Sequence, residues 1–442
     1  MAHKKIVFIL FIICHFAVSA ADFDIRDFGA KADGQFLNTK AIQTAIDKCH
    51  ETGGGTVMVP AGIYLAEMIK MKDAVCLYLS PGAVIKAVNN HNPYSSLIIF
   101  DKVEGASIKG TGKLWGNGKS FEIRESAPNR PYIVYIRGAK NIHVENVELY
   151  DGAAWALRIR DSERVIINGV IIYSHANFNN DGIDIDGKDI IISNCIIDSG
   201  DDAICLKSDN PKRFVENVTI NNCILASNCN FIKMGTSSLC GFRNISISNC
   251  SLRHASESPY HEWNVKSKGS VKDSITGIAG IALEIVDGGT MEQVTISNIT
   301  MTGVQTPIFI RLGSRKNPTG SLKNIVISNI AATSYSLLPS SINAVPDFYV
   351  ENVILRDIII TNKYSTSQTV SEIVPENENA YPENRMFGWT LPSYGFYVRH
   401  AKNIIFDNVR IFPNEPDSRP AFWLEDTKDV DLRNSPGIVY RK

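Results

Sequence analysis

Short stretches of alternating apolar and polar residues recur along most of the chain. Each copy has seven positions: an asparagine, a β-branched residue, a variable residue, a second β-branched residue, a variable residue, another asparagine, and then Cys, Val or Ile. Copies start at Asn141, Arg164, Asp189, Asn217, Asn244, Gln293, Asn324, Asn352 and Asn403, with a weaker one at Asp429. Most starts lie 23 to 31 residues apart, and intervals of 49 and 51 residues indicate either two units or one unit with a long loop.

Alternation with a period of two predicts β-strands. Strands that recur at a nearly fixed spacing without helices between them predict a parallel β-solenoid, in which each coil buries its apolar row against the next. The second asparagine of the pattern is expected in a turn, where its amide bonds backbone groups and stacks between coils. It stands at Asn146, Asn194, Asn222, Asn249, Asn298, Asn329 and Asn408. A β-sandwich is disfavoured because hairpin signals such as Asn-Gly are sparse.

The solenoid also predicts the domain organisation. Its core grows along one axis, so residues 21–442 are expected to form a single domain. Residues 38–49 have helical spacing of apolar positions and are expected to cap one open end. Residues 254–277 and 361–394 break the rhythm, and we interpret them as long loops that wall a groove, with mobile decoration as the alternative.

Residues 1–20 have the features of a secretory signal peptide. Lys4 and Lys5 precede an apolar run over residues 6–18, and small residues at 18–20 fit a cleavage site. A membrane anchor is the alternative, but the run is short for a span. We therefore predict export to the periplasm or the extracellular space, with no membrane span. The net charge of −1 points to neither nucleic acid nor a membrane surface as partner, and the oligomeric state stays open.

The nine cysteines show no metal-like pair spacing. Cys195, Cys223 and Cys250 recur at one repeat position, which indicates small buried fillers rather than a disulfide framework. A disulfide between Cys229 and Cys240 stays open.

A second strand recurs in each coil, and its copies align. They are residues 157–160, 183–186, 204–207, 232–235, 281–284, 308–311 and 396–399. Apolar first and third positions should point inward, so the second and fourth should form two outward columns, with about 4.8 Å between coils. The columns read Arg158, Asp184, Cys205, Lys233, Ala282, Phe309, Tyr397 and Arg160, Asp186, Lys207, Gly235, Glu284, Arg311, Arg399. Such a mixed-charge strip suits an acidic carbohydrate chain, and a solvated face with internal ion pairs is the alternative.

Two acidic clusters stand just before two of these strands, Asn-Asn-Asp-Gly at 179–182 and Gly-Asp-Asp at 200–202. In the strand register Asp181 and Asp202 take equivalent positions on adjacent coils, and Asp201 is offset. Clustered carboxylates shift each other's pKa. An acid and a base about 6.5–9.5 Å apart are what inverting cleavage of a glycosidic bond needs. Tight turns are the alternative, because both clusters also suit them.

At these residues the chain resembles glycoside hydrolase family 28, the polygalacturonase family. The resemblance covers nearly all of residues 21–442 and rests most on Asn-Asn-Asp at 179–181, where the family has Asn-Thr-Asp, and on Gly-Asp-Asp at 200–202. It implies an all-β, single-stranded, right-handed parallel β-helix that hydrolyses pectin with inversion. It also implies that Asp201 is the general acid and that Asp181 and Asp202 hold and deprotonate the attacking water. Asn179 would help to position them, and with Asn180 it is expected to contact substrate.

Two motifs of the family are changed. Where the family has the histidine of its Gly-His-Gly motif, this chain has Asn230. Where the family has Arg-Ile-Lys, which binds galacturonate carboxylates, this chain has Ala-Leu-Glu at residues 282–284. The candidate replacements for gripping the substrate are Lys207, Lys233, Arg243 and Arg311, of which the two lysines rank first because they lie near the acids. The alternative is that either lysine only depresses the pKa of an aspartate. Glu284 in the groove favours hydroxyl-rich, less acidic sugar positions.

We therefore predict an inverting hydrolase of galacturonic-acid-containing pectic poly- or oligosaccharides, exo-acting or of the rhamnogalacturonan type, that uses no cofactor or metal. A Ca²⁺-dependent polysaccharide lyase is a second hypothesis, with Asp181, Asp184, Asp201 and Asp202 around the ion and Lys233 as base. A solenoid that binds glycans without catalysis is a third.

Overall fold

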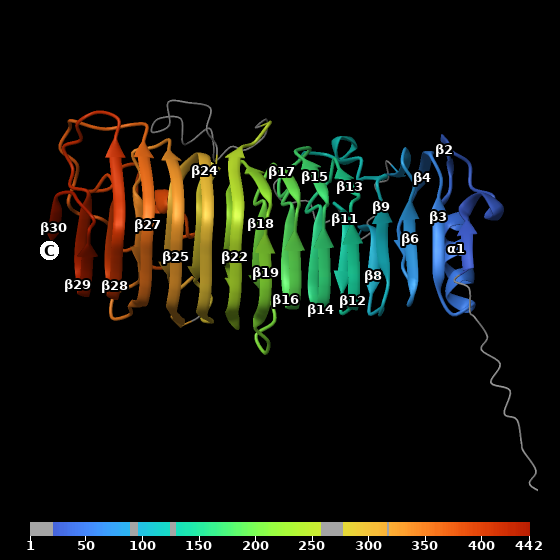
Figure 1. Cartoon of the computed structure of the whole chain (residues 1–442), viewed down its shortest axis with the longest axis horizontal. Helices are drawn as coiled ribbons and strands as arrows, with labels where there is room; N and C mark the ends of the chain where they lie inside the picture. Colours follow the sequence, from blue (N-terminus) through green and yellow to red (C-terminus); the bar gives the residue numbers. More distant parts are fainter. Residues whose placement is uncertain (1–20, 89–95, 124–129, 258–276, 316–317) are drawn as a thin grey trace, which may run out of the picture.

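The protein forms an elongated rod of stacked coils in its computed structural model, which describes residues 21–88, 96–123, 130–257, 277–315 and 318–442. Figure 1 shows the strands side by side across the long axis, with the N-terminal coils at one end and the C-terminal coils at the other. In this part of the chain 30 strands form one hydrogen-bonded network, and they pair in parallel from the first coil to the last. The predicted parallel β-helix is confirmed.

The strands are short in the N-terminal coils and longer towards the C-terminus. The N-terminal coils contain β1 (Ala21–Asp24), β2 (Asp33–Leu37), β3 (Gly55–Val59), β4 (Gly62–Ala66), β5 (Ile69–Lys70), β6 (Val75–Leu79), β7 (Ala83–Ala87), β8 (Ser96–Asp101), β9 (Ser107–Gly110) and β10 (Lys113–Trp115). The central coils contain β11 (Tyr132–Arg137), β12 (Lys140–Glu145), β13 (Glu148–Tyr150), β14 (Leu157–Asn168), β15 (Ile171–Ser174), β16 (Ile183–Ser193), β17 (Ile196–Ser199), β18 (Ile204–Ser208), β19 (Val215–Asn221) and β20 (Ile224–Ser227). The C-terminal coils contain β21 (Asn230–Ser238), β22 (Gly241–His254), β23 (Gly277–Ile285), β24 (Thr290–Leu312), β25 (Ser321–Ser334), β26 (Ser340–Asn343), β27 (Val350–Asn362), β28 (Phe396–Pro413), β29 (Phe422–Arg433) and β30 (Val439–Arg441).

Copies of the seven-residue pattern pair with one another in register. Ile190 of β16 faces Val218 of β19, which in turn faces Ile245 of β22. β22 pairs directly with β24, and β27 pairs directly with β28. The two long intervals of the repeat are therefore each one coil with a long loop, rather than two coils.

Both asparagines of the repeat form ladders at the turns, whereas only the second was predicted to do so. Asn217 and Asn244 have left-handed backbone, with φ of +56° and +54°, a conformation that asparagine tolerates better than most residues. The Asn217 side-chain amide donates to Asp189 at 2.7 Å, and Asn244 donates to Asn217 at 2.7 Å. A second ladder includes the bond from Asn298 to Asn249 at 2.9 Å.

We expect Asn217→Ala to lower the free energy of unfolding by about 2 kcal/mol. Alanine disfavours left-handed backbone by about 1–2 kcal/mol, and the change removes both ladder hydrogen bonds, which each contribute about 1 kcal/mol or less. Asn217→Gly is the matched control, because it removes the same bonds but accepts the backbone conformation. Urea denaturation followed by circular dichroism measures both variants. Equal losses in the two variants would contradict the role of the backbone conformation.

The interior of the coils is apolar and includes the three repeat cysteines. Cys195, Cys223 and Cys250 are at most 2% exposed, which confirms that they are buried fillers. Cys229 and Cys240 are both free thiols, so the structure does not contain the disulfide between them that the sequence left open.

The predicted cap is the helix α1 (Thr39–Glu51), which lies at the N-terminal end of the rod (Figure 1). It buries Ala41, Ile42, Ala45, Ile46 and Cys49 against the first coils. In the described ranges three short 3-10 helices accompany it, η1 (Ile25–Phe28), η2 (Gly118–Ser120) and η4 (Asn384–Phe387). None of the helices in the described ranges is long and apolar enough to cross a membrane. The predicted signal peptide, residues 1–20, and most of the predicted loop at 254–277 lie outside those ranges.

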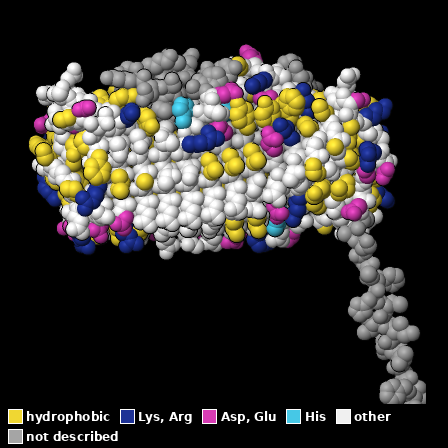
Figure 2. All heavy atoms as spheres, turned by 45° about the horizontal axis from the view of Figure 1, so that its top comes forward, with side chains coloured by type: hydrophobic (Ala, Val, Ile, Leu, Met, Phe, Trp, Pro, Cys, Tyr) yellow, Lys and Arg dark blue, Asp and Glu magenta, His cyan; other side chains and the backbone are white. Residues whose placement is uncertain are grey.

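Charged side chains are unevenly spread over the rod. Figure 2 shows them mainly towards the ends and the long edges, and the broad face between them carries few. This face therefore offers few charged side chains to a ligand.

Candidate active site

The first outward column forms in the predicted register. The second does so only from Glu284 onwards, because the strand pairing shifts beside Arg160 and beside Lys207. Arg158 pairs with Asp184, Asp184 with Cys205, and Cys205 with Lys233 along neighbouring strands. One copy of the second strand was missed: β26 stands between the strands of Arg311 and Arg399, and its Ser341 and Asn343 belong to the two columns. Its sequence, Ser-Ser-Ile-Asn, lacks the apolar alternation by which the other copies were recognised.

Most members of the columns are buried, so the face is neither an open strip nor a solvated sheet surface. Asp184 and Asp186 are fully buried, and Arg158 is 3% exposed. Loops cover these positions, and the charged side chains form ion pairs with one another beneath them. Burying a charge without a partner costs free energy. The ion pairs of this region therefore determine which chemistry its side chains can perform.

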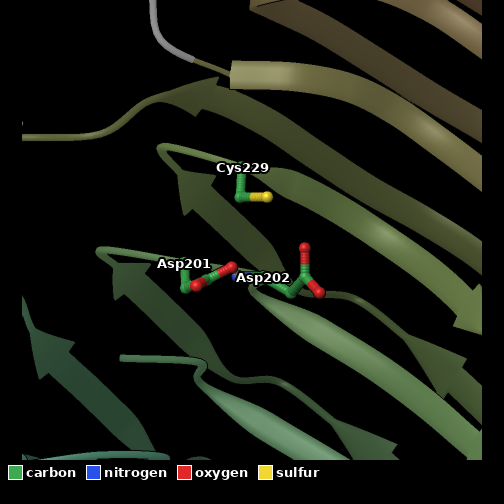
Figure 3. Close-up of side chains that lie close together, drawn as sticks. All are labelled: Asp201, Asp202 and Cys229. Atoms are coloured by element: carbon green, nitrogen blue, oxygen red, sulfur yellow. Dashed lines mark hydrogen bonds between the residues drawn. The ribbon is translucent and has the colours of Figure 1, made fainter. Parts of the chain in front are cut away.

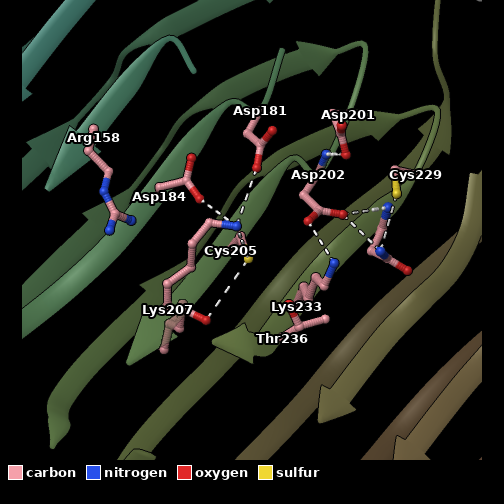
Figure 4. A network of polar contacts seen from close by, with 12 residues as sticks. Arg158, Asp181, Asp184, Asp201, Asp202, Cys205, Lys207, Cys229, Lys233 and Thr236 are labelled. Carbon is pink, nitrogen blue, oxygen red and sulfur yellow. Dashed lines mark hydrogen bonds and ion pairs between the residues drawn. The ribbon is translucent and has the colours of Figure 1, made fainter. Parts of the chain in front are cut away.

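Asp201 and Asp202 lie beside Cys229 (Figure 3), and Figure 4 shows Asp181 next to them, as predicted. Asp181 precedes β16 and Asp202 precedes β18, and because Ile183 pairs with Ile204 the two aspartates are equivalent in neighbouring coils. The backbone N–H of Asp202 donates to Asp201 Oδ1 at 2.9 Å. This hydrogen bond gives the Asp201 side chain a direction different from those of Asp181 and Asp202. Ligand atoms of Asp201, Asp202 and Cys229 lie within 4.8 Å of one another.

Two lysines, Lys207 and Lys233, lie beside the aspartates (Figure 4), and Asn230 also contacts one of them. Lys207 Nζ lies 3.0 Å from Asp184 and 3.5 Å from Asp181. Lys233 Nζ lies 3.0 Å from Asp202 Oδ2. Asn230 donates to Asp202 Oδ1 twice, from its side chain at 2.8 Å and from its backbone at 3.1 Å. Both lysines therefore contact carboxylates of the protein, which supports the alternative that they tune aspartate pKa values.

The environment separates the pKa values of the two consecutive aspartates. Burial and the charge of Asp202 raise the pKa of Asp201 to about 6. Burial alone would also raise the pKa of Asp202, but Lys233, Lys207 and the Asn230 hydrogen bond outweigh it and lower the pKa to about 2. Burial, together with the charges of Asp184 and Asp201, raises the pKa of Asp181 well above its usual range. A proton donor thus stands beside an ionised carboxylate.

The asparagines of the first cluster have different positions. Asn180 is fully buried and donates to the carbonyls of Gly152 and Ala154 at 2.7 and 3.0 Å. It holds the turn, so it does not present its side chain to a substrate. Asn179 has left-handed backbone and accepts a hydrogen bond from Arg130 at 3.0 Å.

Three other predicted substrate contacts are directed elsewhere. Glu284 is 1% exposed, and burial raises its pKa to about 8, so it is a neutral acid at neutral pH rather than a groove charge. Arg311 is 1% exposed and donates to Asn343 and to the carbonyl of Ala344 at 2.8 and 2.9 Å. Arg243 lies on β22 beside Glu216 of β19, in a ladder of alternating charges away from the aspartates. Arg311 and Arg243 therefore bind parts of the chain itself.

Two residues of the site were not foreseen. Arg130 donates to the carbonyl of Ala153 at 2.8 Å as well as to Asn179, and so ties a loop to the first cluster. Tyr381 accepts a hydrogen bond from Lys233 at 3.3 Å. Both stand in loops without the repeat pattern, and no sequence signal marked them.

The comparisons with known proteins place the chain among the glycosyl hydrolases. The profile of glycosyl hydrolases family 28 matches residues 49–379, so the chain belongs to this family. A probable polygalacturonase of Arabidopsis thaliana is 24% identical over 388 residues, which are 83% of this chain and 79% of the relative. An exo-poly-alpha-D-galacturonosidase of Dickeya chrysanthemi is 26% identical over 248 residues, 41% of each chain.

Solved structures show the same fold. A hyperthermoactive exopolygalacturonase from Thermotoga maritima superposes with a TM-score of 0.64 at 21% identity, covering 77% of this chain and 87% of that one. A family 28 exopolygalacturonase of Yersinia enterocolitica superposes with a TM-score of 0.63 at 16% identity, covering 94% and 78%. At such identity the agreement concerns the β-helix, and the chemistry has to be argued from the site.

Proposed function

We propose that the protein is an inverting glycoside hydrolase that cleaves galacturonic-acid-containing pectic saccharides. The observation that carries the proposal is that Asp201 lies beside Asp202, whose two oxygens are held by Lys233 and Asn230. These contacts separate the pKa values of the two aspartates. Between pH 2 and 6 the first is protonated and the second ionised. Asp201 would give its proton to the leaving glycosidic oxygen, and Asp181 and Asp202 on neighbouring coils would hold and deprotonate the attacking water. Because ligand atoms of Asp201 and Asp202 lie within 4.8 Å of each other, closer than the about 6.5–9.5 Å of an inverting acid–base pair, the water is expected on the side of Asp181.

The neighbours of these two residues have supporting roles in the proposal. Lys233 and Asn230 keep Asp202 ionised and orient it, since they contact its two oxygens. Asp181, held by Lys207 at 3.5 Å, would orient the attacking water from the adjacent coil. Lys207 and Lys233 would thus act through the aspartates rather than by gripping a substrate carboxylate.

The same contacts argue against the two other hypotheses. A Ca²⁺ ion needs several free carboxylate oxygens, whereas those of Asp181, Asp184 and Asp202 already face ammonium groups. A protein that only binds glycans has no need of a proton donor beside an ionised carboxylate. Hydrolysis uses both groups.

Exo attack is part of the proposal. The loop over residues 363–395 covers the outward face of the coils that follow the acids, where Phe309, Ser341 and Tyr397 are at most 1% exposed. A saccharide at the acids would meet this loop on the C-terminal side, which favours binding by a chain end. The exo-acting enzymes among the relatives are consistent with this direction of attack.

The pKa values predict the pH dependence of kcat/KM. Asp201 has to be protonated, so activity should fall as pH rises through about 6. Asp202 has to be ionised, so activity should fall as pH drops through about 2. We expect a bell-shaped profile with these two limbs, measured from initial rates on oligogalacturonate. A maximum at pH 8 would contradict the assigned roles.

The proposal is tested by product analysis. The protein is incubated with polygalacturonan, rhamnogalacturonan and their oligosaccharides, and early products are followed by NMR and chromatography. We expect products whose anomeric configuration is opposite to that of the cleaved bond, with short saccharides released first. Retained configuration or an ultraviolet-absorbing unsaturated product would overturn the hydrolytic proposal. A broad ladder of intermediate products would overturn exo attack alone.

A further inference from the structure

A free thiol stands beside the two consecutive aspartates of the candidate active site. One carboxylate oxygen of Asp201, one of Asp202 and the sulfur atom of Cys229 lie within 4.8 Å of one another, and Figure 3 shows the three side chains together. Cys229 is 7% exposed. It precedes Asn230, so it stands where the Gly-His-Gly motif of the family has a glycine. The motif of the family therefore does not account for this thiol.

The turn that carries Cys229 is fixed against the turn that carries Asp201. Ser227 Oγ donates to the carbonyl of Asp201 at 2.6 Å and accepts the backbone N–H of Cys229 at 2.8 Å. The carbonyl of Cys229 accepts from the backbone N–H of Ile278 at 2.6 Å. The sulfur atom therefore has a defined position relative to the Asp201 carboxyl group.

Asn230 determines where the thiol hydrogen points. Its amide nitrogen donates to Asp202 Oδ1 at 2.8 Å and to Cys229 Sγ at 3.3 Å, so both amide hydrogens are used. Because the sulfur accepts from Asn230, its own hydrogen is available for another acceptor. That acceptor is the Asp201 carboxyl group. Burial and the charge of Asp202 raise the pKa of Asp201, and the hydrogen bond with Cys229 acts in the opposite direction.

Cys229 keeps its hydrogen over the pH range in which Asp201 titrates. Burial and the charges of Asp202 and Asp201 raise the pKa of the Cys229 thiol well above its usual range, whereas the pKa of Asp201 is about 6. When Asp201 gives up its proton, its neighbour is therefore a neutral thiol that donates a hydrogen bond, and not a thiolate that repels the new charge.

We propose that Cys229 is a positioning residue for the proton donor, whose S–H group, directed by Asn230, stabilises the Asp201 carboxylate as the proton leaves. This inference rests on the proposed function, in which Asp201 is the general acid. The transferred proton comes from Asp201 and goes to the leaving oxygen, while the S–H bond stays intact. A hydrogen bond that is stronger to the ionised acid than to the neutral acid lowers the barrier to this transfer. The backbone N–H of Asp202 is a second donor to the same group.

The charged groups around the pair stay in place when the thiol is removed. Those that act on Asp201 or on Cys229 are Asp181, Asp202, Lys207, Lys233, Arg130 and Glu383. A change in the pKa of Asp201 in a variant of Cys229 therefore reports the loss of the thiol.

The pH–rate profile tests the assignment. Cys229→Ala removes the donor, so the pKa of Asp201 rises and the basic limb of kcat/KM should move up by about 0.5 to 1 pH unit. The maximal rate should fall about three- to tenfold, the size expected for one hydrogen bond. Cys229→Gly is a second variant without the donor, and Cys229→Ser keeps a donor and should return the limb towards its wild-type position. Cys240→Ala, which removes the free thiol near Arg243 and Glu216, is the control.

The pKa of Asp201 is also measured without substrate. Protein labelled at the aspartate carboxyl carbons is titrated by NMR, and the signal that Asp201→Asn lacks identifies Asp201. We expect a raised pKa in Cys229→Ala and in Cys229→Gly, and a smaller change in Cys229→Ser. Circular dichroism checks that each variant is folded.

The outcomes separate this inference from the proposed function. An unmoved basic limb and an unchanged Asp201 pKa in the two donor-free variants would overturn the role of the thiol, even if the wild type hydrolyses pectic chains. A slower rate with an unmoved limb would overturn it as well, because it would indicate a structural effect alone. Absence of hydrolysis by the wild type, together with a raised Asp201 pKa in Cys229→Ala, would overturn the proposed function and leave the contact of thiol and acid supported.

Discussion

Replacing Asp201 by asparagine is expected to lower kcat/KM by about 100- to 10,000-fold, the range that a positioned general acid contributes. Asparagine has nearly the same shape and keeps an oxygen that accepts from the Asp202 N–H, a bond of 2.9 Å in the wild type. It carries no transferable proton, so the leaving oxygen would depart unprotonated. Initial rates on oligogalacturonate, with folding checked by circular dichroism, measure the effect.

The control is the same substitution at a ladder position. Asp189 accepts a hydrogen bond from Asn217 at a turn, and asparagine keeps an acceptor there as well as tolerance for left-handed backbone. Asp189→Asn should retain activity within about twofold, since surface changes away from special features have small effects. If Asp201→Asn were as active as this control, the general acid would have to be another residue.

Replacing Lys233 by methionine is expected to lower activity and to shift the pH profile. Lys233 is the largest influence that lowers the pKa of Asp202. Without it the pKa of Asp202 rises, so the base becomes protonated at a higher pH and the acidic limb of kcat/KM moves up. The substitution also leaves a buried carboxylate unpaired, and breaking such a pair costs about 3–5 kcal/mol. The pH–rate profile and urea denaturation measure the two effects.

Two variants accompany this prediction. Lys233→Arg keeps the positive charge and should return the acidic limb towards its wild-type position. Lys188→Met removes a lysine that lies 3.3 Å from Glu163 and is 38% exposed, so it should affect neither the limb nor stability strongly. If the acidic limb of the kcat/KM profile were unchanged in Lys233→Met, another group would have to keep Asp202 ionised.

The solenoid was predictable because its information is local and repeated. Alternating β-branched residues specify a strand wherever they occur, and the asparagines specify the turn after it. Each copy supports the same register, so Asp181 and Asp202 could be aligned without knowledge of any contact. β26 was missed because Ser340–Asn343 lacks this alternation. It is a strand because it pairs with β24 on one side and β28 on the other.

The partners within the site were only partly predictable. Lys207 and Lys233 were placed near the acids by register, but which carboxylate each one contacts depends on side-chain direction and on burial. Arg311 occupies its predicted column, yet a loop lies over it and takes its hydrogen bonds. The position in a column specifies where the residue lies on its strand, and the loops determine which groups its side chain contacts.

By itself the sequence determined the coil, the cap helix, the equivalence of Asp181 and Asp202, and the offset of Asp201. Only the tertiary structure decided the protonation of these acids, because desolvation and the charges of Lys207 and Lys233 set their pKa values. It also decided the contact between Lys233 and Tyr381, which are 148 residues apart. The alternation of apolar and polar residues is a property of neighbouring residues and can be read from the sequence. The course of a long loop depends on contacts that form only when the chain folds.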